Sequence, residues 1–234
     1  MKKFDFHIHT CCSKHWIWGI DGLSTPREVV ETAISRGLDG IAVSDHNTTK
    51  GGLIAARIAK KIDKNFLVIP SMEVKSKIGD VLAIGVAEEL TIRSRSLTAE
   101  EAVEQMREKG AVIIAPHPYG REGLGSLVEK LGFDALEGFN ARILPRFNRK
   151  AKELATKLGL PMVASSDAHI ADEIANGITA LNINELSIDA VKDAIIKGKT
   201  KIYQERRTKS MGRVYTKKFG LLLHVAKRPL CEQT

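Results

Sequence analysis

Short aliphatic segments alternate with helical segments along most of this 234-residue chain, and no other feature constrains the fold as strongly. Several of these segments are continuous runs of Val, Ile, Ala and Leu, which is typical of strands buried on both faces of a parallel sheet. We predict strands at residues 3–8, 40–44, 66–70, 80–85, 111–116, 135–139, 161–165 and 178–183.

The segments between these strands carry helix start and stop signals. Thr25 and Glu28 form a capping box around Pro26, and Gly37 is placed to end that helix. Similar signals predict helices near residues 98–110, 148–158 and 187–198. Strand–helix units repeat in right-handed crossovers, and about seven of them in about 200 residues favour a closed barrel over an open sheet.

The net charge of +8 is confined to the end of the chain. Residues 199–234 contain ten Lys or Arg and two Asp or Glu, whereas the preceding residues carry 26 charges of each sign. We therefore predict a barrel domain at residues 1–203 and a basic C-terminal tail at residues 204–234. The tail is either a solvated end or a contact for an anion such as nucleic acid.

The chain has no apolar run near the roughly 20 residues that a membrane span requires. Its first residues carry charges and histidine where a signal peptide needs an apolar stretch. We expect a cytoplasmic protein without a membrane partner.

Histidine and acidic residues fall at the carboxyl ends of the predicted strands. In a parallel barrel all of these ends open on one face, where functional sites are built. Scattered structural uses would not place so many such residues at the same end of successive strands. The candidate ligands are His7, His9, His15, His46, Glu73, His117, Asp167 and His169.

A mixed set of imidazoles and carboxylates indicates the kind of metal. Such ligands suit Zn²⁺, Mn²⁺ or Fe²⁺ better than Mg²⁺ or Ca²⁺, which prefer oxygen ligands. His7 and His9 lie two apart on one strand, so both rings point to the same side. One ion would leave ligands unused, so we expect two or three divalent ions, with Glu73 able to bridge a pair.

The ordered motifs resemble those of the PHP (polymerase and histidinol phosphatase) family over roughly residues 1–205. The resemblance implies a distorted (β/α)7 barrel of the TIM-like type, a trinuclear metal site and phosphoesterase activity. The motifs are His7-x-His9-Thr10, Ser13-x-His15, Ser44-Asp45-His46-Asn47-Thr48, Glu73, Pro116-His117-Pro118 and Ser166-Asp167-x-His169.

The resemblance also assigns ligands to each ion. His7, His9, Glu73 and Asp167 would hold the first ion, Glu73 and His117 the second, and His15, His46 and His169 the third. The chain departs from the family pattern at Asp80, where many small-molecule phosphatases of the family have a histidine. Asp80 either coordinates in its place or leaves the second position weaker.

The expected reaction is hydrolysis of a phosphate ester by metal-activated hydroxide. Asp45 would orient a ligand imidazole or take a proton. Arg142 follows a predicted strand, and its guanidinium matches phosphate geometry, so it is the candidate clamp for the phosphoryl group. Tyr119 and Arg121 lie just beyond His117 and are further candidates for substrate binding.

Four functions remain open at this point. The first is a phosphoesterase acting on a small phosphorylated metabolite or nucleotide. The second is a 5′–3′ exonuclease that holds RNA or DNA ends with the basic tail. The third is a non-catalytic scaffold of the same shape, which a complete ligand set argues against. The fourth is a hydrolase of the amidohydrolase type, which Glu73 and the Asp167–His169 pair fit poorly.

Overall fold

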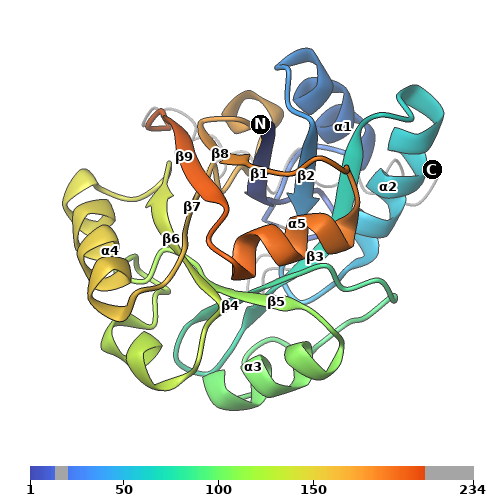
Figure 1. The fold of residues 1–234 in the computed structure, drawn as a ribbon. Coiled ribbons are helices and arrows are strands. Elements are labelled where there is room, and N and C mark those ends of the chain that lie inside the picture. The colour runs from blue at the N-terminus through green and yellow to red at the C-terminus, as the bar shows by residue number, and fades with distance from the viewer. Residues whose placement is uncertain (14–20, 209–234) are drawn as a thin grey trace.

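A computed structural model describes residues 1–13 and 21–208, which form an α/β barrel (Figure 1). The described residues contain one nine-stranded sheet in the order β7-β6-β5-β4-β3-β2-β1-β8-β9. The strands are β1 (Lys2–Ile8), β2 (Gly40–Val43), β3 (Leu67–Lys75), β4 (Asp80–Ile84), β5 (Val112–Ala115), β6 (Ala135–Asn140), β7 (Met162–Ser165), β8 (Gly177–Leu181) and β9 (Thr200–Glu205).

The sheet curves until its two sides meet. Strand β7 reaches β8 through Thr179, whose hydroxyl accepts from the Ala164 N–H at 2.8 Å and donates to the Ala164 carbonyl. The segment after β7 also pairs with the end of β1, because His9 donates its N–H to the Ala168 carbonyl. The barrel is therefore nearly closed at the point where the functional motifs of β1 and β7 come together.

Two strands break the repeating strand–helix pattern. Strand β4 runs antiparallel to both β3 and β5, and a short turn rather than a helix joins it to β3. Strand β8 runs antiparallel to β1 and β9. The remaining neighbouring pairs are parallel, so β1, β2, β3, β5, β6 and β7 end on the same face.

Helices surround the barrel, and Figure 1 shows α5 lying across one end of it. Their bounds are α1 (Pro26–Ser35), α2 (Lys50–Ile62), α3 (Ala99–Glu108), α4 (Pro145–Leu158) and α5 (Ile188–Ile196), with 3₁₀ turns η1 (Gly125–Lys130) and η2 (Ala171–Glu173). Capping boxes at Thr25 and Thr98 start α1 and α3. None of the helices in the described part of the chain has the length and apolarity that crossing a membrane requires.

One core cluster fills the barrel at the end where the parallel strands begin. It joins Phe4 and Phe6 of β1, Ile84 of β4, and Val191 and Ile195 of α5, all fully buried. Burial of aliphatic and aromatic side chains is the main stabilising contribution to such a core. Helix α5 thus closes this end and leaves the opposite end for polar side chains.

All eight predicted strands exist, but several bounds differ. Strand β3 extends to Lys75 instead of ending at Pro70, so Glu73 lies inside a strand rather than after it. Helix α2 and strand β9 have no counterpart in the sequence prediction. Most of the predicted tail, and His15 among the candidate ligands, lies outside the described residues.

Candidate metal centre

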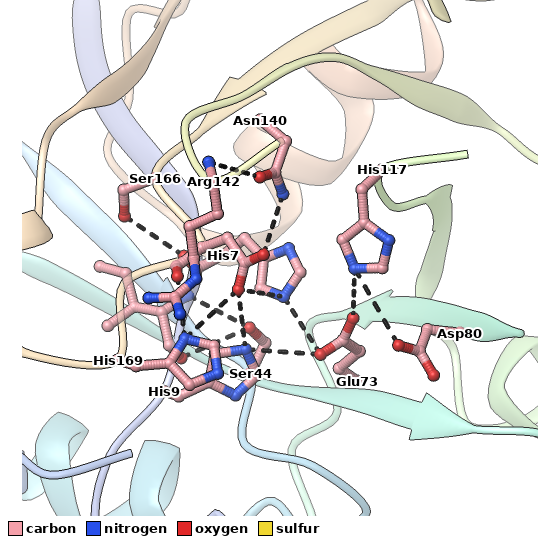
Figure 2. Close-up of polar contacts among 12 residues, drawn as sticks. His7, His9, Ser44, Glu73, Asp80, His117, Asn140, Arg142, Ser166 and His169 are labelled. Atoms are coloured by element: carbon pink, nitrogen blue, oxygen red, sulfur yellow. Dashed lines mark hydrogen bonds and ion pairs between the residues drawn. The ribbon is translucent and has the colours of Figure 1, made fainter. Parts of the chain in front are cut away.

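The candidate ligands of the described residues converge at the carboxyl end of the barrel, and Figure 2 shows five of them: His7, His9, Glu73, His117 and His169. His7 lies on β1 and His9 just after it, Glu73 lies on β3, and the others follow β2, β5 and β7. All are buried, with exposed fractions from 0% for His7 to 8% for Asp167. The complete set is His7, His9, His46, Glu73, His117, Asp167 and His169.

The backbone is strained at several of these positions. Asn47, His117 and Asp167 have φ values of 58°, 27° and 53°, in the left-handed region that non-glycine residues rarely adopt. Each such residue costs on the order of 1–3 kcal/mol, and such strain persists mainly at functional sites. His117 and Asp167 are candidate ligands themselves, and Asn47 directly follows His46.

Glu73 lies at the centre of the cluster. Its Oε2 atom is 3.2 Å from His7 Nε2, 3.4 Å from His9 Nε2 and 2.9 Å from His46 Nδ1. Its Oε1 atom is 3.0 Å from His117 Nε2. One carboxylate therefore reaches four imidazoles, which is the arrangement expected of a bridging ligand.

Among residues 1–13 and 21–208, three overlapping groups have ligand atoms within 4.8 Å of one another. The first group is His7, His9 and Asp167, the second is His7, Glu73 and His117, and the third is His9, His46 and His169. Spacings of this size let one small cation contact several donors at ordinary metal–ligand distances of about 2.0–2.3 Å. The geometry accommodates more than one ion.

Several of these donor atoms are buried without a hydrogen-bond partner. Within the described residues, His7 Nε2, His9 Nε2, His46 Nδ1 and Glu73 Oε2 form no hydrogen bond, despite their short mutual contacts. Buried polar atoms are almost always paired, so unpaired ones require an explanation such as an ion. Nitrogen and carboxylate oxygen atoms that converge at such short distances suit metal binding.

The opposite nitrogen of His7 is held by a carboxylate that sequence reasoning missed. Glu137, fully buried on β6, accepts from His7 Nδ1 at 3.1 Å, from the His117 N–H at 2.7 Å and from Asn140 Nδ2 at 2.9 Å. A carboxylate behind an imidazole fixes its tautomer and leaves the other nitrogen free to bind metal. The fold prediction placed Glu137 on a strand, but no motif marks it.

A second missed residue is Asp21. Its Oδ2 atom is 3.0 Å from His46 Nε2 and 3.3 Å from His169 Nε2. The resemblance placed His15, from the same loop, beside these two rings. The available signal was an acidic residue in the loop that follows the His-x-His motif.

Asp45 contacts the backbone of that same loop. Its carboxylate accepts from the Thr10 N–H at 2.5 Å and from the Thr10 hydroxyl at 2.7 Å. Burial raises the pKa of Asp45 to about 6, although the bonds from Thr10 lower it. The role expected of Asp45, orienting a ligand imidazole or taking a proton, stays a prediction; among the described residues Glu137 makes such an orienting bond, to His7.

Arg142 lies at the edge of the cluster, as Figure 2 shows. Its Nη1 atom is 2.6 Å from Glu173 Oε2, which also accepts from the His169 N–H. Its side chain is 15% exposed. Tyr119 is half-buried beneath the ammonium of Lys150, and Arg121 is exposed.

Protonation of the imidazoles depends on the carboxylates around them. Burial lowers the pKa of His117, but Glu73 more than offsets this, and the pKa rises to about 9. His46 behaves alike: burial and Lys75 lower its pKa, Glu73 and Asp21 raise it, and the result is about 9. Without a metal, protons therefore supply part of the positive charge that this cluster requires.

Comparison with known proteins agrees with this geometry. The family model described as PHP-associated matches residues 145–200. An uncharacterized protein of Methanocaldococcus jannaschii is 33% identical over 147 residues, which cover 59% of this chain and 82% of that protein. The chain belongs to the PHP family.

Solved structures share the fold. A two-domain protein from Bacteroides vulgatus, described as containing a predicted PHP-like metal-dependent phosphoesterase, aligns with a TM-score of 0.71 at 19% identity, over 87% of this chain and 65% of that chain. A lesion-specific endonuclease from Pyrococcus furiosus aligns with a TM-score of 0.59 at 18% identity, over 86% of this chain and 57% of that chain.

Proposed function

We propose that this chain is a metal-dependent phosphoesterase that hydrolyses phosphate esters of a small metabolite or nucleotide. The observation that carries the proposal is the set of buried, convergent donor atoms around Glu73 that lack hydrogen bonds within the described residues. A barrel that served only as a scaffold would have no reason to bury unpaired nitrogen and oxygen atoms, because each costs roughly 1–3 kcal/mol.

The donors divide among two or three divalent ions. His7, His9, Asp167 and Glu73 would hold one ion, and His46, His169 and Asp21 another, with His9 close to both sets. Glu73 and His117 remain for a third position. The mixture of imidazole and carboxylate ligands favours Mn²⁺, Zn²⁺ or Fe²⁺.

Ions bound there would make water nucleophilic near neutral pH and offset the charge of a phosphoryl group. The chain's own residues fix the geometry. Glu137 orients His7 and the His117 backbone, and Asp45 fixes the Thr10 segment. Arg142 forms an ion pair with Glu173, and its guanidinium would bind a phosphoryl oxygen of the substrate.

The test is a screen of phosphate monoesters, nucleotides and short oligonucleotides with the purified full chain and Mn²⁺. We expect turnover of at least one class of ester. Asp167→Ala should lower that rate about a thousandfold, because losing a ligand removes several kcal/mol of transition-state stabilisation. The rate should be measured alongside circular dichroism and bound metal.

Asp189→Ala is the matched control. Asp189 is an exposed carboxylate in the first turn of α5, at the other end of the barrel, and its loss should leave the rate unchanged. A chain that binds no divalent metal and cleaves no ester would contradict the proposal and favour the scaffold. Cleavage of oligonucleotides alone would favour the exonuclease, and loss of that cleavage after deletion of residues 206–234 would assign the strand contact to the tail.

A further inference from the structure

The hairpin of β3 and β4 carries a buried ion pair next to the metal centre. Lys75 and Asp80 are register partners across the hairpin, and their residues are 7% and 2% exposed. The Lys75 Nζ atom is 3.1 Å from Asp80 Oδ2. Lys75 is two residues from Glu73 on the same strand, so both side chains point toward the same side of the sheet.

The pair adjoins the Glu73–His117 end of the centre, as Figure 2 shows for Asp80. The Asp80 Oδ2 atom that contacts Lys75 is also 4.0 Å from His117 Nε2, and His117 Nε2 is 3.0 Å from Glu73 Oε1. The ammonium nitrogen is thus within about 7 Å of the His117 ring nitrogen. The Lys75 ammonium is therefore a fixed positive charge beside the position, between Glu73 and His117, that a further divalent ion would take.

The Asp80 carboxylate is therefore already engaged in an ion pair with Lys75. It belongs to none of the three groups of donors found among the described residues, although it lies beside one of them. Its negative charge is already offset by the ammonium. A divalent ion at this position would have Glu73, His117 and a shared His7, and it would be repelled by Lys75.

We propose that Lys75, held by Asp80, replaces a divalent ion at the Glu73–His117 end of the centre, so that the chain binds two ions rather than three. This inference rests on the proposed function. In it Lys75 is a positioning cation: it supplies one fixed positive charge and keeps Asp80 from acting as a metal ligand.

The experiment measures metal per chain by mass spectrometry after loading the full chain with Mn²⁺ and removing excess by gel filtration. The wild type should retain two equivalents. Lys75→Met removes the ammonium, keeps a similar volume and releases Asp80, so that variant should retain three. A gain of metal on removing a lysine is an outcome that a purely structural ion pair would not give.

Three further variants isolate the cause. Lys75→Arg keeps the cation and should retain two equivalents. Lys75→Met/Asp80→Asn removes the released carboxylate and should return the count from three to two. Lys77→Met changes an exposed lysine of the same hairpin turn and should also retain two.

Two results would overturn the inference. One is three equivalents in the wild type, and the other is two in folded Lys75→Met. In both cases the proposed phosphoesterase function would stand, because metal would still be bound. A wild type without metal would instead contradict the proposed function itself. If Lys75→Met does not fold, three equivalents in Lys75→Gln would support the inference and two would overturn it.

Discussion

The two ends of the barrel are built from the same strands, but one end buries apolar side chains and the other buries polar ones. At the end closed by α5, Phe4, Phe6 and Ile195 are fully buried in an apolar cluster. At the other end, Glu73 and the four imidazoles around it are also buried but polar, and several of their donor atoms are unpaired within the described residues. On β1 the change occurs between neighbouring residues, Phe6 of the apolar cluster and His7 of the metal centre, where the register of β1 against β2 shifts between Asp5 and Ile8.

The two ends contribute to the free energy of folding with opposite signs. The apolar end gains free energy from burial, at roughly 25 cal/mol for each Å² removed from water. The polar end buries charges and left-handed backbone, both of which are unfavourable unless an ion or protons compensate. We therefore expect metal and pH to change the stability of the polar end, and truncation of core side chains to change that of the apolar end.

The largest effect should come from pH acting on the metal-free polar end. The folded pKa values of His46 and His117 are raised to about 9 from an ordinary 6.5. The stabilisation that these two protonated imidazoles give the folded state is fully present below pH 6.5. It is lost as the pH rises from 6.5 through 9, because over that range the unfolded chain has already released the protons that the folded state still binds. The loss is on the order of 3 kcal/mol per imidazole.

Metal should remove that slope. Metal binding requires neutral imidazole and releases the protons that the metal-free folded state holds, so the stabilisation from Mn²⁺ should grow between pH 6.5 and 9. Urea unfolding with a chelator and with Mn²⁺, at pH 6.5, 8 and 9.5, measures both slopes. If the free energy of unfolding had the same pH dependence with the chelator and with Mn²⁺, the imidazoles of the polar end would not be the source of that dependence. His117→Gln should weaken the dependence in the chelated protein.

Sequence reasoning located most of this polar end but not its outer partners. The His-x-His pair at the end of β1 and the candidate ligands after β2, β5 and β7 could be located, because strand ends in a barrel share a face. Glu73 was predicted from its position after the strand expected at residues 66–70, although that strand extends to Lys75. Glu137 and Lys75 were not found, because a single buried charge on a strand has no spacing that distinguishes it from a surface residue.

The fold class and all eight predicted strands were correct, but two elements were missed for similar reasons. Strand β9 alternates between half-buried and exposed residues and is largely polar, so it gives a weak hydrophobic signal. Helix α2 begins without a side-chain cap and has two glycines in its first turn, both of which weaken a helix prediction. Gly51 and Gly52 are needed there because a Cβ atom would lie 1.9 Å from an Asp45 oxygen and 2.9 Å from Pro70.

A smaller effect is expected from the apolar end. Ile195→Ala removes a fully buried side chain of α5 from the core cluster. The free energy of unfolding should fall by about 3 kcal/mol, the usual cost of such a truncation. Bound Mn²⁺ per chain should not change. Ile196→Ala is the matched control, since Ile196 is 55% exposed and its loss should cost less than about 0.5 kcal/mol. Altered metal content in folded Ile195→Ala would show that the two ends are coupled.

The smallest effect should come from α3, a helix outside the barrel that contributes to neither the apolar cluster closed by α5 nor the metal centre. The Thr98 hydroxyl accepts from the Glu101 N–H at 3.2 Å, and Glu101 accepts from the Thr98 N–H at 2.7 Å. Thr98→Ala should lower the free energy of unfolding by about 1 kcal/mol, the ordinary value of such a cap. For a chain of this size that corresponds to a fall in Tm of roughly 2–4 °C.

Metal content should stay constant in Thr98→Ala, and so should its rate of ester hydrolysis. Thr98→Ser, which keeps the accepting hydroxyl, is its control and should restore most of the stability. If Thr98→Ala lost metal as well as stability, α3 would be coupled to the metal centre. A change of about 1 kcal/mol outside the barrel would then alter metal binding at the polar end.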